Sequence, residues 1–277
     1  MRNSWFAGGL FLSVLSSAGF AKASVDELAA ASAAEVRGDA MFAYDQAAWH
    51  ATDKFQEDLR RQGVDLAKLA AQGFKGYIVE PGEGGQLLAS FYAQRDGRSF
   101  ALARYRVTGS TVSGGGLVEP DSTATLSLLA LRMIDAREKA IQQMALPDHA
   151  LCSNSPANTL VLPPQADGSV PVYVLTSTAV GGVYPAGGHY RFDYDADGKL
   201  LGERRFMKSC FQIDYRSKDG NTLKAVFLTH LLDPQPTEIH VFVQRNIPIS
   251  LMVGTVSNNA MWSVEAGKVR YVRDFPK

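Results

Sequence analysis

The chain has 277 residues, of which 46% are hydrophobic and 20% charged, and its 28 basic side chains balance 28 acidic ones. This apolar fraction is too high for an intrinsically disordered chain. Because a nucleic-acid-binding domain needs a basic surface, the balanced charge gives no reason to expect nucleic acid as a partner. Two cysteines are too few for a disulfide-dense small scaffold or a four-thiolate zinc site.

The first 23 residues have the three parts of a secretory signal peptide. Arg2 is followed by an uncharged stretch over 5–21 with an apolar centre, and Ala21-Lys22-Ala23 places small residues at both positions of an A-x-A cleavage site. A retained membrane anchor is the alternative, but the stretch is short for a spanning helix and is diluted by glycine and serine. We therefore expect cleavage after Ala23, which predicts a periplasmic or secreted protein without a membrane span.

Cleavage would change the charge balance only slightly. Residues 1–23 contain Arg2 and Lys22 and no acidic residue, so 26 basic and 28 acidic side chains remain in 24–277. That length suits one large domain or two small ones. We expect one exported domain over 24–277; a boundary near residue 147, separating 24–146 from 147–277, is the alternative.

Both cysteines, Cys152 and Cys210, lie in the part expected to be exported. An even number of cysteines in an oxidising compartment predicts a disulfide bond, whereas two buried free thiols are the alternative. The segment around Cys152 is typical of a loop and that around Cys210 of a strand. A catalytic Cys210 would need a neighbouring base, which the sequence does not supply.

Helical patterns precede a hairpin in the first part of the chain. Apolar residues recur every three or four positions from 41 to 59, which predicts a long helix from Asp39 to about residue 62. Gly38 is expected to separate this helix from a shorter one that begins at residue 25. A further turn or two of helix is expected over 64–72.

A β-hairpin, a loop and a second helix are expected next. Asp96-Gly97 lies between two β-prone runs, 86–94 and 99–108, and is a strong hairpin signal. The glycine-rich segment 109–116 predicts a flexible loop. Helical spacing returns over 122–144, and Pro147 is expected to end this helix.

The rest of the chain has the patterns of strands. The residues from His189 to Tyr194 alternate strictly between aromatic and polar side chains. The order of N-terminal helices and a β-hairpin, a second helix and then a mainly antiparallel β meander predicts an α+β fold. The expected strands of this part cover 159–162, 170–178, 189–194, 199–206, 225–231, 238–244, 247–253, 261–264 and 268–272.

One segment resembles a calcium-binding loop in part. Asp193 to Gly198 matches the first six positions of the pattern D-x-D-x-D-G, but Arg204 occupies the position that needs a bidentate glutamate. The flanks are strand-like, so we interpret the segment as the turn of a β-hairpin. No metal site and no cofactor are expected.

Two histidines are the candidates for chemistry. The sequence contains no G-x-S-x-G, S-x-x-K or H-E-x-x-H motif. His189 and His240 lie on expected strands, and neighbouring strands would allow a joint catalytic or metal-binding role. Ordinary structural histidines are the alternative.

The missing catalytic motifs favour a non-enzymatic exported envelope protein. It would bind an unknown envelope partner or a small ligand, or have a structural role. The alternative is an extracytoplasmic hydrolase that uses dispersed His, Asp and Ser residues.

Overall fold

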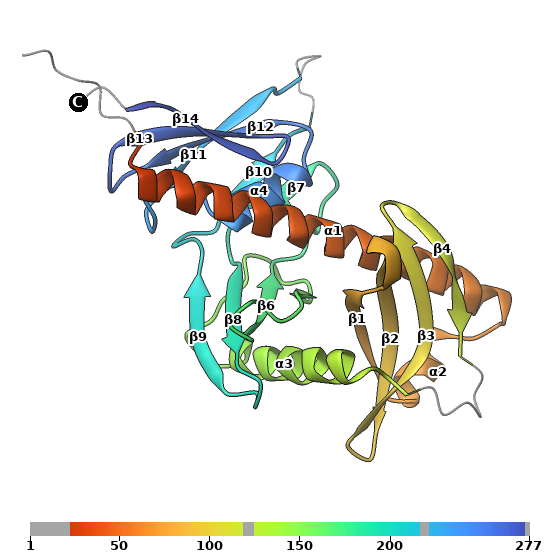
Figure 1. Ribbon diagram of the computed structural model, residues 1–277. Helices are drawn as coiled ribbons and strands as arrows, with labels where there is room; N and C mark the ends of the chain where they lie inside the picture. The colour runs from red at the N-terminus through yellow and green to blue at the C-terminus, as the bar shows by residue number, and fades with distance from the viewer. Residues whose placement is uncertain (1–22, 119–124, 217–221, 275–277) are drawn as a thin grey trace, which may run out of the picture.

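The computed structural model describes residues 23–118, 125–216 and 222–274 of the chain (Figure 1). An N-terminal helix is followed by strand hairpins, a second long helix and mostly antiparallel sheets, which confirms the α+β class. The helices of these ranges are α1 (Val25–Arg61), α2 (Leu66–Ala71), α3 (Leu128–Met144) and α4 (Glu238–Arg245), with one 3-10 turn at Glu83–Gly85.

The first sheet is antiparallel, in the order β1-β2-β3-β4. The predicted hairpin is confirmed as β2 and β3, which turn at Asp96 and Gly97 with φ of 51° and 73°. The expected flexible loop over 109–116 is wrong, because it forms the edge strand β4. A Cβ at Gly115 would lie 2.0 Å from the backbone oxygen of Arg104, so only glycine fits this pairing. The strands are β1 (Phe74–Pro81), β2 (Leu87–Arg95), β3 (Arg98–Thr108) and β4 (Thr111–Leu117).

The second sheet is also antiparallel, in the order β5-β6-β8-β9. The turn between β8 and β9 contains Asp195 to Gly198, which confirms the hairpin interpretation of the calcium-like segment. Cys210 lies between β9 and β10 outside any strand, so its expected strand is wrong. The strands are β5 (Asn158–Val161), β6 (Val170–Leu175), β8 (Tyr190–Tyr194) and β9 (Leu200–Arg205), with a small separate pair of β7 (Val183–Pro185) and β10 (Gln212–Asp214).

The third sheet has the order β11-β12-β13-β14, and its first two strands are parallel. Parallel neighbours need a crossover connection, and α4 lies in it. The expected strand over 238–244 is therefore wrong. All seven of its residues are buried, which removes the periodicity that distinguishes a helix from a strand. The strands are β11 (Ala225–His230), β12 (Ser250–Thr255), β13 (Ala260–Glu265) and β14 (Lys268–Asp274).

Helix α1 is continuous, so the break expected at Gly38 is wrong. A Cβ at this position would lie 2.5 Å from the Cβ of Val241 on α4. Gly38 is thus the point where two helices approach closely, rather than a helix end. At the start of α1, the Ser24 hydroxyl accepts from the Glu27 N–H, and the Ser24 N–H donates to the Glu27 carboxylate.

Helices α1 and α3 pack against the three four-stranded sheets (Figure 1). The first half of α1 contributes Ala31 and Met41 to a core shared with α4 and the third sheet. Its second half packs Phe55 and neighbours on one face of the first sheet. Helix α3 begins at Leu128 after the Ser127 cap and packs between the other face of that sheet and the second sheet. Residues 122–124 of the expected second helix lie outside the described ranges.

Candidate functional site

His189 lies directly before β8 and is fully enclosed. Its Nδ1 accepts a hydrogen bond from the Thr176 N–H at 3.2 Å, and its Nε2 donates to the Pro185 carbonyl at 3.0 Å. The side chain is 1% exposed, and this burial lowers its pKa to about 4. Because both ring nitrogens are occupied by backbone groups, His189 fixes the chain path here and has no nitrogen free for a substrate or metal.

His240 lies in the first turn of α4, not on a strand. Its Nδ1 accepts from the Thr237 N–H at 3.0 Å, so the proton of the neutral ring is on Nε2. Burial is the main cause that lowers its pKa well below the usual value, and His230, 4.7 Å away between ring centroids, adds to the effect. His189 also acts on it electrostatically. The structure therefore buries both predicted histidines, one directly before β8 and the other on α4.

Sequence reasoning did not single out His230, whose ring lies edge-on to the ring of His240. Its Nε2 lies 2.8 Å from the Asp233 carboxylate, and its Nδ1 has no hydrogen-bond partner among the described residues. The Nε2 of His240 is unpartnered as well. A metal on that nitrogen would require the ring proton to move to Nδ1, where a backbone N–H already points. Within the described ranges, no group of three His, Cys, Asp or Glu side chains is arranged to hold a metal ion.

The predicted disulfide between Cys152 and Cys210 is confirmed. The Cys152 N–H donates to the Thr176 hydroxyl, which donates to the Gly188 carbonyl. The bond thus joins the chain after α3 to the chain after β9, beside the backbone that His189 holds. Its surroundings indicate a structural role.

A groove runs between α1 and the β8–β9 hairpin. It consists of two hollows, of about 240 Å³ and about 220 Å³, that share the side chains of Arg37 and Arg191 as walls. We call it the α1–β8 groove. The larger hollow is lined further by Gln165, Asp167, Ser169, Asp193, Leu201 and Gly202. The smaller one reaches the start of α4 and is lined further by Ala30, Ala33, Ala34, Arg204 and residues 235–238.

Glu238 organises the charges in this groove. Its Oε1 accepts from Arg191 at 2.7 Å and from the Tyr173 hydroxyl at 3.2 Å, and it lies 3.7 Å from Arg37. The side chain is 7% exposed. Charge-assisted hydrogen bonds of this kind offset the cost of burying a carboxylate. Arg204 pairs separately with Asp233 at 2.8 Å.

Arg37 is the least committed of these cations. Its guanidinium makes the 3.7 Å contact with Glu238 and no hydrogen bond to any described residue, and its side chain is 34% exposed. A guanidinium carries five N–H donors in a planar fork. The groove therefore presents open donors at the point where its two hollows meet.

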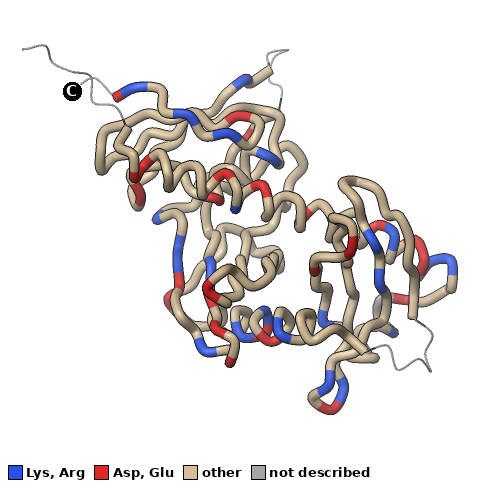
Figure 2. The backbone as a smooth tube through the Cα atoms, in the orientation of Figure 1, with Lys and Arg blue, Asp and Glu red and all other residues tan. Residues whose placement is uncertain are grey.

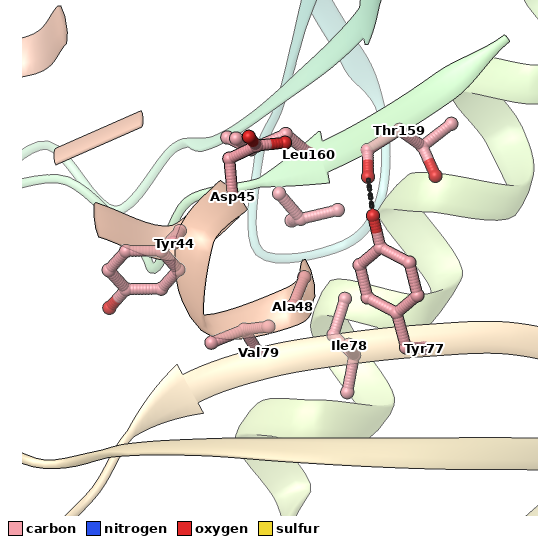
Figure 3. Close-up of a pocket in the computed structure, with 9 residues that line it drawn as sticks. Tyr44, Asp45, Ala48, Tyr77, Ile78, Val79, Thr159 and Leu160 are labelled. Atoms are coloured by element: carbon pink, nitrogen blue, oxygen red, sulfur yellow. Dashed lines mark hydrogen bonds between the residues drawn. The ribbon is translucent and has the colours of Figure 1, made fainter. Parts of the chain in front are cut away.

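A second polar site lies where α1 meets β1 and β5, but it has little room (Figure 3). Tyr77 donates to Asn158 at 2.9 Å and reaches the Thr159 carbonyl, and Asn158 donates to Asp45 at 3.2 Å. Burial raises the pKa of Asp45 to about 6. The hollow between these residues holds about 10 Å³, roughly the space of one water molecule. This site is a polar contact between α1, β1 and β5 and leaves no room for a ligand.

No local sequence signal marks the α1–β8 groove. Arg37 lies on α1, whereas Arg191 lies on β8 and Arg204 on β9. The two strands are far from the helix in the sequence. Basic and acidic residues are interspersed over all layers of the molecule (Figure 2). Only the fold brings the three guanidinium groups together.

The described residues include no helix that is long and apolar enough to cross a membrane. No family model matches the sequence. No curated protein and no solved structure matches it either.

Proposed function

We propose that this protein is an exported, non-enzymatic binding protein that holds a small polar ligand in the α1–β8 groove. The observation that carries the proposal is Arg37, which offers open donors between two adjoining hollows. Ligand sites are concave and direct a few convergent polar groups at the ligand. The groove has this character, since its polar walls come from α1, β8, β9 and the start of α4.

Export is part of the proposal, and two features support it. Residues 1–23 have the pattern of a signal peptide. The Cys152–Cys210 disulfide suits an oxidising compartment such as the periplasm or the extracellular space. Mass spectrometry of the protein from an envelope fraction tests this part. The expected mass is that of a chain that begins at Ser24, and a mass that includes Met1 to Ala23 contradicts export with cleavage.

Binding is favoured over the alternative of an extracytoplasmic hydrolase. The nearest arrangement to a nucleophile and base is Thr237, whose Oγ1 lies 3.0 Å from His240 Nδ1. That same nitrogen accepts the Thr237 backbone N–H, so it is not free to take a proton from a hydroxyl. Thr237 is also buried.

The experiment is a ligand screen on the processed protein. Sugars, amino acids, carboxylates and inorganic phosphate are tested by thermal shift, because a ligand of the folded state raises the melting temperature. We expect at least one class to raise it for the wild type and not for Arg37→Gln. Arg60→Gln is the control, since Arg60 is exposed at the far end of the same helix. A screen without any stabilising compound, or equal shifts in Arg37→Gln, contradicts binding in this groove.

A further inference from the structure

The third sheet is covered by helices on one of its two faces. Helices α1 and α4 pack on the face where Leu251, Val253 and Trp262 join the core. Side chains alternate between the faces of a strand, so the neighbours of these residues point to the other face. In Figure 1 the third sheet lies above α1, and β8 and β9 lie below this helix. The uncovered face is therefore directed away from the α1–β8 groove.

The strand register arranges this face in two rows of cross-strand neighbours. Each row begins on β11, crosses β12 and β13 without a charged side chain and ends in an arginine on β14. The rows are Phe227, Met252, Ser263 and Arg270, and Thr229, Gly254, Met261 and Arg273. We call these eight residues the open face.

The two arginines of the open face are not neutralised by the part of the chain that the structure describes. Arg270 and Arg273 are exposed and make no hydrogen bond or ion pair with any described residue. Lys268, at the start of the same strand, pairs with Glu35 at 3.1 Å. Glu265 is the described acidic residue nearest to the rows, opposite Lys268 in the register. Basic residues thus follow β14 along the top of the molecule (Figure 2).

The rest of the open face is apolar or short. Phe227 is 49% exposed, and Met252 and Met261 are partly exposed. A hollow of about 680 Å³ opens beside Met252 and Ser263, so the described side chains leave the space above this part of the sheet unfilled. An apolar strip and a basic strand therefore lie side by side on one face.

We infer that the open face is a membrane-contact surface, which lies on an anionic lipid bilayer with the β14 arginines at the headgroups and the methionines at the acyl boundary. Interfacial binding combines buried apolar area with the attraction of basic side chains to anionic lipids. The inference goes beyond the proposed function and does not depend on it, because the α1–β8 groove takes no part in the contact.

An anionic bilayer complements the open face more readily than an acidic protein does. The long side chains of the face are flexible methionines and arginines, and mobile lipid headgroups adjust to each of them. A protein partner would need fixed carboxylates opposite both Arg270 and Arg273 and an apolar surface beside them. The bilayer is therefore the partner that we propose.

The test is co-sedimentation of the processed protein with lipid vesicles. Vesicles of phosphatidylcholine alone are compared with vesicles that also contain phosphatidylglycerol, at low ionic strength. We expect binding to the anionic vesicles that decreases as salt is added, and weak binding to the neutral ones. Equal binding to the two kinds of vesicle, or no binding to the anionic kind, overturns the inference.

Two double variants separate the open face from a general charge effect. Arg270→Gln with Arg273→Gln is expected to weaken binding to the anionic vesicles about tenfold or more, because two basic groups leave the surface. Arg60→Gln with Arg98→Gln changes the net charge equally at exposed positions of α1 and β3 and is expected to bind like the wild type. An equal effect of the two double variants overturns the inference.

A second pair of variants tests the apolar strip. Met252→Gln is expected to weaken binding about threefold or more, since it removes an apolar group from the contact. Leu128→Gln removes an apolar side chain that is 87% exposed at the start of α3, and is expected to bind like the wild type. Unchanged melting temperatures show that both variants fold. Equal binding of the two folded variants overturns the contact of Met252 with lipid, and with it the inference.

Polyglutamate is the probe for an acidic protein partner. If polyglutamate binds and the exchange of Arg270 and Arg273 abolishes this binding, while neither kind of vesicle binds, the open face recognises an acidic protein and the membrane contact is wrong.

Discussion

Burial acts in opposite directions on two ionisable side chains, His189 and Asp45. It lowers the pKa of the histidine to about 4 and raises that of the aspartate to about 6. In both cases the neutral form is favoured, because a charge loses its hydration in the interior. Both residues therefore make the stability of the protein depend on pH, with opposite signs.

The His189 side chain is expected to make the fold sensitive to acid. The unfolded chain protonates a histidine near pH 6.5 and the folded chain protonates His189 near pH 4. Between these values the unfolded state binds more protons, so stability falls as the pH decreases. Urea unfolding at pH 7.5 and 4.5 should show that wild type loses about 2–3 kcal/mol more than His189→Gln. His50→Gln, at a partly exposed position of α1, is the control; equal losses in all three proteins would refute the assignment.

Asp45 is expected to weaken the fold at neutral pH. The unfolded chain releases this proton near pH 4 and the folded chain near pH 6. The folded state binds more protons in between, so stability falls as the pH rises through that interval. Asp45→Asn, which keeps an acceptor for Asn158, should raise the free energy of unfolding by about 1–3 kcal/mol at pH 7.5 and leave it nearly unchanged at pH 4. The exposed Asp53→Asn should show no such gain, and a destabilised Asp45→Asn at pH 7.5 would contradict the argument.

At the scale of elements, the contact of α1 with α4 depends on Gly38. A methyl group there would lie 2.5 Å from the Val241 Cβ and 2.9 Å from the Glu238 carbonyl oxygen. Overpacking of this kind costs about 1–3 kcal/mol, which exceeds the gain in helix propensity from glycine to alanine. Gly38→Ala should therefore lower the free energy of unfolding, measured by urea denaturation.

Two further variants test whether the cause is the α1–α4 contact. Gly116→Ala has open space around its Cβ and should be nearly neutral. Val241→Gly combined with Gly38→Ala should be more stable than the sum of the two single effects predicts, because glycine at 241 removes both Val241 atoms that the new methyl group would meet. Strict additivity would show that the loss comes from elsewhere.

The elements that the sequence patterns predicted correctly are those with a local signal. The Asp96-Gly97 hairpin and the turn before Gly198 follow from residues that accept left-handed backbone angles. Helix α4 was mistaken for a strand because burial on all sides hides the helical period. Strand β4 was mistaken for a loop because its pairing with β3 outweighs the low strand propensity of three consecutive glycines.

The candidate site was less predictable than the fold. The disulfide was predicted from the cysteine count and the expected compartment, and the structure confirms the bond. The α1–β8 groove did not follow from any pattern, since Arg37 meets Arg191 and Arg204 only through the packing of α1 over β8 and β9. His189 and His240 were noticed as residue types, but their backbone partners could not be known before the fold.

At the scale of the whole molecule, the cores do not divide evenly near residue 147. The core of α4 and the third sheet includes Ala31 and Met41 of α1, and the core of the second sheet includes Met133 and Ile134 of α3. In contrast, the core between α1 and the first sheet lies wholly within 44–117. The later part of the chain thus depends on helices from the earlier part, whereas the reverse dependence is weaker.

We therefore predict that fragment 147–277 does not fold alone, while fragment 24–146 keeps the packing of Phe55 on the first sheet. Isolated 147–277 should show poorly dispersed amide signals and no cooperative melting transition, since it lacks α1 and α3 to cover its apolar faces. Mixing it with 24–146 should restore a cooperative transition. A sharp melting transition of 147–277 alone would support a domain boundary near 147.

The long reach of α1 has a consequence for the timing of folding. The first residues of the helix meet their partners on α4 and the third sheet only after more than two hundred further residues have been added, as the core from Ala31 to Val264 requires. Contacts between such distant segments form late and leave apolar surface open in the meantime. Under the proposed export, the chain would cross the membrane with its amino terminus first, so the first half of α1 would emerge before its partners on α4 and the third sheet. A holding chaperone on the far side of the membrane would shield it during that interval.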